Sequence, residues 1–153
     1  MMLSPPDRYR LCTEQMSISA PLRPANIAFL HESGCRKIIT LAGGFVSADV
    51  VAALKSSRME VIHFPLECTV YPAVFEGQVT RILQHISECH DAGSKLHVVC
   101  GPEMVEAAVA LGLFRTACNK WRPSSALSEC LEVCRFVDAE TVSRLVLETE
   151  ISL

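Results

Sequence analysis

Short apolar runs alternate with amphipathic stretches along the whole chain. Residues 37–41 are β-branched and apolar, as in a buried parallel strand, and residues 60–64 and the apolar run 96–99 predict two further strands. Residues 8–18 indicate an irregular pair of short strands. Apolar residues at helical spacing predict helices over residues 24–31, 47–57, 73–90, 105–119, from 123 onward and 138–148. Because strands alternate with helices, we predict an α/β fold with a mostly parallel central sheet flanked by helices on both sides.

Several helix ends carry the residues that favour them. Gly34 is the expected C-cap of the first helix, Ser47 is a plausible N-cap of the second, and Gly93 lies beyond the end of the third. Pro72 precedes this third and longest helix. Its predicted inner face consists of Val74, Val79, Ile82, Leu83 and Ile86.

The composition fits one soluble domain. The chain has 153 residues, half of them apolar, and no linker or repeat divides it, so we predict a single domain over residues 1–153 with a loose lead-in at residues 1–7. The net charge of −3 supplies no basic field for nucleic acid or an anionic membrane surface. No apolar stretch approaches the roughly 18 residues that span a bilayer, and the N-terminus is too polar for a signal peptide. We therefore expect a cytoplasmic protein.

The eight cysteines are best interpreted as free thiols, because a domain of this size needs no disulfides to be stable. Cys130 and Cys134 would share one face of a helix and could begin a metal site, but no second pair of ligands has comparable spacing. Cys100 with Glu103 and Glu106 could also bind a cation, although thiolate and carboxylate ligands are an uncommon mixture. We predict no metal and no cofactor.

Residues 98–108, V-V-C-G-P-E-M-V-E-A-A, hold the candidate site. A buried strand ends at a cysteine, and a short loop then leads into a helix. Such a loop directs backbone N–H groups and the positive end of the helix at whatever lies above the cysteine, which suits an anion. Loops that bind phosphate in this way have an arginine six residues after the cysteine, and here Glu106 occupies that position.

This replacement reverses the charge of the site. An arginine about 4 Å from an anion attracts it by roughly 4 kcal/mol per unit charge at an effective dielectric constant of about 20, and a glutamate repels it by a similar amount. Glu103 adds a second carboxylate, and a left-handed turn at that position would be strained. We therefore predict an unreactive thiol. The candidate site comprises Cys100, as the vestigial nucleophile position, and the binding loop Gly101, Pro102, Glu103, Met104, Val105 and Glu106.

The chain resembles the tyrosine phosphatase superfamily, most closely the plant and fungal atypical dual-specificity phosphatases. The resemblance rests on the segments at residues 5–9, 21–24, 35–41, 113–115, 121–123 and 135–138, in this order and spacing. The family pattern His-Cys-x5-Arg-Thr/Ser becomes Val99-Cys100-x5-Glu106-Ala107, so only the nucleophile position matches. The loop that should carry a catalytic acid, residues 66–77, contains no aspartate.

The resemblance implies the fold of a dual-specificity phosphatase and a catalytically impaired member, a pseudophosphatase, that is not an active enzyme. Its expected role is that of a binding or regulatory subunit for a protein partner, with a related phosphatase as one candidate. Two alternatives stay open. One is an active cysteine phosphatase that hydrolyses phosphotyrosine or inositol pyrophosphate substrates through Cys100, and the other is a thiol redox or sulfur-transfer domain.

Two further residues have candidate roles. Arg115 matches a family position and is expected to support the loop or to form a surface ion pair. His63, near the end of a strand, is the histidine placed to reach a pocket at that edge of the sheet, and a structural role is the simpler interpretation.

Overall fold

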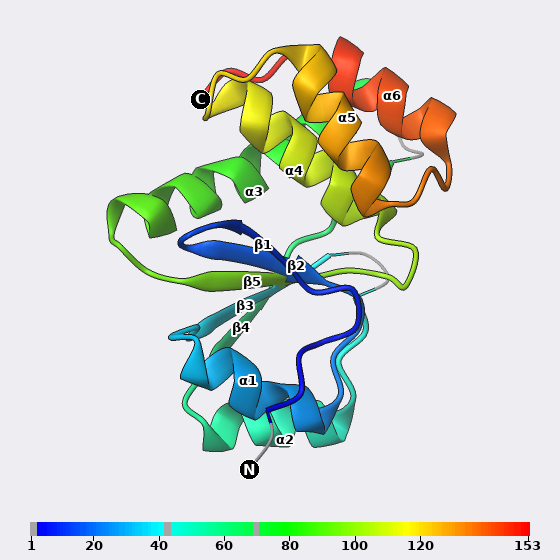
Figure 1. Ribbon diagram of the computed structural model, residues 1–153. Coiled ribbons are helices and arrows are strands. Elements are labelled where there is room, and N and C mark those ends of the chain that lie inside the picture. The colour runs from blue at the N-terminus through cyan, green and yellow to red at the C-terminus, as the bar shows by residue number, and fades with distance from the viewer. Residues whose placement is uncertain (1–2, 42–43, 69–70) are drawn as a thin grey trace.

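The computed structural model describes residues 3–41, 44–68 and 71–153 (Figure 1). Its elements follow in the order β1 (Arg10–Thr13), β2 (Met16–Ser19), the 3₁₀ turn η1 (Pro24–Asn26), α1 (Ile27–Glu32), β3 (Lys37–Thr40), α2 (Ala48–Ser56), β4 (Glu60–His63), α3 (Pro72–Asp91), β5 (Leu96–Val99), α4 (Val105–Ala117), α5 (Pro123–Val133) and α6 (Ala139–Glu148). The alternation predicted from the apolar runs is therefore present.

The five strands form one sheet in the order β1-β2-β5-β3-β4. The pair β1 and β2 is antiparallel, and the other three pairs are parallel. Strand β5 is central, with Val98 aligned to Ile18 on one side and to Ile39 on the other. The end of this central strand leads directly into Cys100, so the candidate loop lies at the middle of the sheet edge.

Helices cover both faces of the sheet, as predicted. Figure 1 shows α1 and α2 on one face and α3, α4, α5 and α6 on the other. Because successive strand residues point to opposite faces, Ile38 joins the apolar cluster under α1 and α2, whereas Ile39 joins the larger cluster under α3 and α4. The candidate loop opens the helix α4, which belongs to the larger cluster.

The predicted helix ends are largely confirmed. Ser47 caps α2, because its Oγ accepts a hydrogen bond from the N–H of Val50. Gly34 and Gly93 follow α1 and α3 in the left-handed region, with φ of +93° and +72°. The inner face predicted for α3 is wrong at one position: Val74 is 48% exposed, whereas Phe75 is buried. Phe75 lies four residues before the buried Val79, so it continues the same face of the helix.

The segment predicted to be a loose lead-in is anchored where the structure describes it. The side-chain amide of Asn26 donates hydrogen bonds to the carbonyls of Ser4 and Pro5, at 3.1 and 3.2 Å. The N–H of Ala20 donates to the carbonyl of Asp7 at 3.0 Å. Residues 1 and 2 lie outside the described residues.

All eight cysteines are free thiols, as predicted, and Cys130 and Cys134 are buried in the core. Within residues 3–41, 44–68 and 71–153, no group of three or more His, Cys, Asp or Glu side chains is placed to hold a metal ion. None of the described helices combines the length and the apolar character needed to cross a bilayer.

Candidate functional site

Cys100 lies at the end of β5, and its side chain is completely buried. Its N–H donates to the carbonyl of Ser19 on the neighbouring strand at 3.2 Å. The Sγ atom lies 3.5 Å from the carbonyl oxygen of Gly101 and 3.7 Å from the Sδ atom of Met104. The thiol therefore faces protein atoms of its own loop.

The loop contains a left-handed residue, but not where the sequence predicts the strain. Met104, not Glu103, has φ of 64° and ψ of 20°. The reason is its place between turn and helix: its N–H donates to Gly101, and its carbonyl accepts from Ala108 in the first turn of α4. In this conformation the side chain of Met104 is buried against the Cys100 sulfur.

The Cys100 thiol is held in its protonated form. Burial raises its pKa to about 12. A backbone hydrogen bond from Ala107 and the charge of Arg8 lower this pKa, whereas the charge of Glu106 raises it further. The thiolate is the nucleophilic form of cysteine, and a raised pKa reduces the thiolate fraction at neutral pH.

Acidic side chains gather beside this thiol. Glu106 is half-buried in the first turn of α4, and burial raises its pKa, with further increases from the charges of Glu103 and Asp138. Burial also raises the pKa of Cys68 to about 12, and the charges of Glu106 and Asp138 contribute. The structure thus brings the predicted Glu103, Glu106 and Cys100 together with Cys68 and Asp138, whose proximity the sequence does not indicate.

Arg8 is the cation that the sequence pattern misses. One guanidinium nitrogen donates to the carbonyl of Pro102 in the loop at 3.0 Å, and the other donates to the carbonyl of Val133 at the end of α5. Arg8 and Pro102 are 94 positions apart in the chain, so no local spacing signals the contact. The guanidinium is used to attach the loop to α5.

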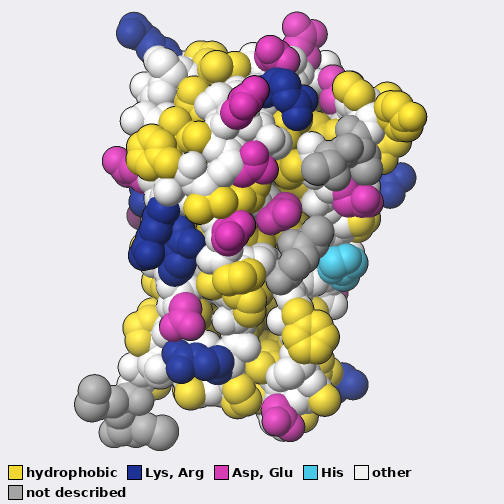
Figure 2. Space-filling model, turned by 90° about the vertical axis from the view of Figure 1, so that its right-hand side faces the viewer, with side chains coloured by type: hydrophobic (Ala, Val, Ile, Leu, Met, Phe, Trp, Pro, Cys, Tyr) yellow, Lys and Arg dark blue, Asp and Glu magenta, His cyan; other side chains and the backbone are white. Residues whose placement is uncertain are grey.

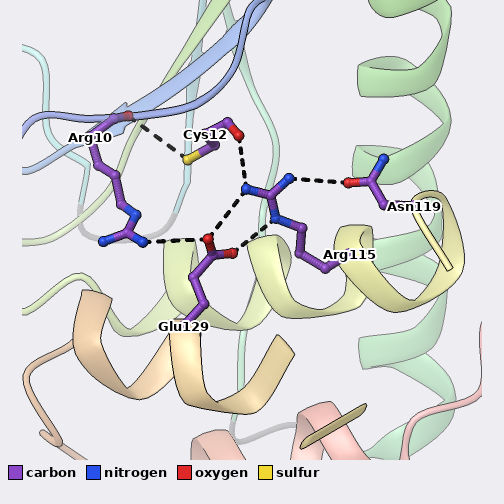
Figure 3. A network of polar contacts seen from close by, with 5 residues as sticks. All are labelled: Arg10, Cys12, Arg115, Asn119 and Glu129. Carbon is purple, nitrogen blue, oxygen red and sulfur yellow. Dashed lines mark hydrogen bonds and ion pairs between the residues drawn. The ribbon is translucent and has the colours of Figure 1, made fainter. Parts of the chain in front are cut away.

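Arg115 lies in a buried polar network (Figure 3). Its Nε donates to Glu129 at 2.9 Å, one Nη donates to the carbonyl of Cys12 at 2.8 Å, and the other Nη donates to Asn119 at 3.2 Å. The guanidinium carbon also lies 4.3 Å from the centre of the Trp121 ring. Arg115 therefore joins β1, α4 and α5 as a buried ion pair, rather than forming the surface pair considered from the sequence.

Two histidines lie on strands, His63 on β4 and His97 on β5. His63 bonds through Nδ1 to the hydroxyl of Thr40 at 2.9 Å, in keeping with a structural role. It borders an open pocket of about 560 Å³ that is lined on its other sides by Leu41, Gly44, Phe45, Val46 and Val61. His97, in contrast, is fully buried between the hydroxyls of Ser17 and Ser19.

Large apolar side chains are exposed around this edge of the sheet. Phe45, Tyr71 and Phe136 are 76%, 82% and 64% exposed. Gly44 brings the first of these close to the end of β5, because a Cβ atom at Gly44 would lie 2.4 Å from the carbonyl oxygen of Val99. Figure 2 shows one side of the molecule, with several acidic side chains among hydrophobic ones near the middle.

Similarity to known proteins is found in structure and not in sequence. No protein-family model matches the chain, and no curated protein matches its sequence. The core catalytic domain of the PP-IP phosphatase SIW14 from S. cerevisiae, in complex with citrate, matches with a TM-score of 0.80 and 16% identity, over 94% of this chain and 86% of that one. Tk-PTP in its active form matches with a TM-score of 0.74 and 15% identity, over 94% and 96% of the two chains. TpbA from P. aeruginosa matches with a TM-score of 0.64 and 14% identity, over 93% and 92%.

These matches cover nearly the whole chain at low identity, so they bear on the fold alone. The chain therefore has the α/β fold of the tyrosine and dual-specificity phosphatase-like proteins.

Proposed function

We propose that this protein is a catalytically impaired phosphatase-like protein that acts as a binding or regulatory subunit. The observation that carries the proposal is the state of Cys100. Its thiol is buried against Met104, and burial raises its pKa to about 12. A phosphatase that attacks through cysteine needs the thiolate in contact with the substrate, and both conditions are unfavourable here.

The charges of the loop support the same proposal. Glu103 and Glu106 add two carboxylates to the loop, and Glu106 stands six residues after Cys100, where phosphate-binding loops have an arginine. Arg8 donates to backbone carbonyls, and Arg115 is paired with Glu129. Neither guanidinium replaces the missing arginine above Cys100.

A binding role is supported by the exposed apolar side chains beside the loop. Phe45, Tyr71 and Phe136 are 76%, 82% and 64% exposed, and aromatic residues are enriched in protein-binding surfaces. We propose a protein partner, and a related phosphatase with the same fold is one candidate. The redox or sulfur-transfer alternative is disfavoured, because it also needs a reactive thiolate at Cys100.

Turnover of phosphate esters tests the catalytic half of the proposal. The protein and its Cys100→Ser variant would be incubated with para-nitrophenyl phosphate and with an inositol pyrophosphate. We expect the two proteins to release phosphate at the same background rate. Release by the wild-type protein that Cys100→Ser abolishes would establish the active cysteine phosphatase instead.

A pull-down from cell extract tests the binding half. We expect the tagged protein to recover a stable complex that also elutes together on size exclusion. Phe45→Ser and Phe136→Ser should weaken this complex, whereas Leu147→Ser, which changes an apolar side chain that is 52% exposed on α6, should not. Recovery of the wild-type protein only as a free monomer would count against a binding role.

A further inference from the structure

An open pocket of about 200 Å³ lies beside the candidate loop and is lined by three arginines. Arg8 precedes β1, Arg10 begins β1, and Arg135 follows the end of α5. Met104, Tyr9 and Glu132 also line the pocket. Two distant parts of the chain, residues 8–10 and Arg135, therefore bring three guanidinium groups to one concave site in a protein whose net charge is −3.

The positive charge of this pocket is only partly neutralised. Arg8 donates to two backbone carbonyls, which satisfy its hydrogen bonds without removing its charge. Arg10 lies 3.4 Å from Glu129 but shares that carboxylate with Arg115, and its side chain is 40% exposed. Within the described residues, Arg135 has no carboxylate partner. The lining contains one acidic side chain, that of Glu132, against the three arginines.

Unusual backbone conformations coincide with the pocket. Arg8, Met104 and Arg135 have positive φ angles of 57°, 64° and 52°. Residues other than glycine seldom adopt this left-handed conformation, and where they do the positions are enriched at binding and catalytic sites. Two of the three arginines thus have left-handed backbone conformations, and that of Arg135 forms the end of α5, whose Leu131 carbonyl accepts from the N–H of Phe136.

We propose that this pocket binds the phosphoryl group of a phosphate, free or as a monoester, without hydrolysing it. Guanidinium groups donate pairs of hydrogen bonds in the geometry that phosphate oxygens accept. Tyr9 supplies a fixed wall, because its ring contacts Phe29 and His97 with centroids 5.0 and 5.9 Å apart.

The lining of the pocket includes Met104 and does not include the Cys100 thiol. Met104 contacts the Cys100 sulfur and is buried over it, so it separates that sulfur from the pocket. Binding here uses none of Cys100, Glu103 or Glu106. It therefore goes beyond the proposed function, and it can fail while the turnover and pull-down experiments succeed.

Titration of the ¹⁵N-labelled protein, followed by NMR at constant ionic strength, tests the site. Inorganic phosphate and phenyl phosphate are the two ligands. We expect saturable shifts of the amide signals of Tyr9, Met104 and Arg135 with at least one of them. Tighter binding of phenyl phosphate would identify a monoester as the ligand, and equal binding would identify the free anion, so either supports the site.

Variants of opposite charge sharpen the test. Arg135→Gln should weaken binding about fivefold, and Glu132→Gln should strengthen it by a similar factor, because both groups are exposed to solvent. Arg81→Gln and Glu148→Gln make the same charge changes at exposed positions on α3 and α6 and should leave the affinity unchanged. If Arg135 only stabilised the fold, Arg135→Gln could still weaken binding, but Glu132→Gln would not strengthen it. Tighter binding by Glu132→Gln therefore indicates that the charge of the pocket determines the affinity.

Three results would overturn the proposal. The first is the absence of saturable shifts with either ligand. The second is an equal loss of affinity in Arg81→Gln, which would reduce the effect to overall charge. The third is a set of shifts centred on Gly101 and Ala107, which would place the anion over Cys100 and would count against the proposed function as well.

Discussion

At the scale of single residues, His97 illustrates a polar side chain that has become part of the core. Its Nδ1 pairs with the hydroxyl of Ser17 and its Nε2 with that of Ser19, both at 2.7 Å. These contacts join β2 to β5 at a position three residues before Cys100 in the chain. Burial lowers the pKa of His97 to about 3, so the ring stays neutral in the folded protein.

This buried ring should make the protein sensitive to mild acid. Between pH 6.5, its ordinary pKa, and about pH 3, the unfolded chain binds a proton on His97 that the folded chain excludes. Stability from this group is therefore present above pH 6.5 and falls with decreasing pH, by at most about 1.4 kcal/mol per pH unit. Urea unfolding at about pH 7 and about pH 5 measures the change. In His97→Asn, which cannot titrate there, the dependence should be shallower, and an unchanged dependence would contradict this assignment.

Sequence alone identifies some residues of the site and not others. Cys100, Glu103 and Glu106 follow from one local motif, and the structure brings them together. Arg8 and Asp138 could not be found in this way, because they reach the loop through tertiary contacts between distant segments. The left-handed conformation of Met104 depends on the turn before α4, and its position is not occupied by glycine, the residue that usually indicates this conformation in a sequence.

At the scale of elements, helix α4 is the piece on which the larger core is built. Residues 107–115 are all buried, so this helix has no solvent face over most of its length. It packs against both α5 and α6, and Gly112 lies at this junction. A Cβ atom at Gly112 would be 2.5 Å from the Cys130 sulfur and 2.9 Å from a methyl group of Val146.

A pair of glycine substitutions should therefore have opposite effects. Gly112→Ala should lower the free energy of unfolding by about 1–3 kcal/mol, because the added methyl group overpacks the junction. Gly77→Ala, inside α3 with nothing within 4 Å of the new Cβ atom, should raise it by about 0.5–1 kcal/mol through helix propensity. Thermal or urea unfolding of both variants provides the measurement. Stabilisation by Gly112→Ala would show that the helices can separate at little cost.

The elements themselves were the part most accessible from sequence. The apolar runs and the capping residues place all the major helices and strands, because these signals are local. The exception at Val74 arises since two adjacent apolar residues at a helix start do not reveal which one faces the core. Sheet order was not predicted, because nothing local specifies that β5 lies between β2 and β3.

At the scale of the whole molecule, the buried free thiols together affect how the stability of the protein depends on pH. Burial raises the pKa of six of them from 9.0: to about 11 for Cys35 and to about 12 for Cys12, Cys68, Cys100 and Cys130, and it also raises the pKa of Cys134. They are spread over both apolar clusters and their margins, so ionisation of any of them opposes the packed state. Well below pH 9 these six thiols are protonated in both the folded and the unfolded chain.

The protein should consequently lose stability in moderate alkali. Above about pH 9 the unfolded chain releases thiol protons that the folded chain keeps, so stability declines as pH rises toward 12, by up to about 1.4 kcal/mol per pH unit for each thiol. Urea midpoints at about pH 8 and about pH 10 check this. Cys130→Ala should be less stable at both values but have a smaller difference between them, and a midpoint independent of pH would contradict the expectation.

The pairing of β2 with β5 also determines how the chain can assemble. Ser17 and His97 lie side by side but are 80 positions apart, and the segments between them form the opposite half of the sheet. At a synthesis rate of about 5–20 residues per second, the β1–β2 hairpin waits roughly 4–16 s before its partner strand is made. During that interval Met16 and Ile18, which are buried in the folded protein, remain exposed on the nascent chain, where chaperones are expected to bind them. The long separation of the paired strands also predicts slow folding for a chain of this size.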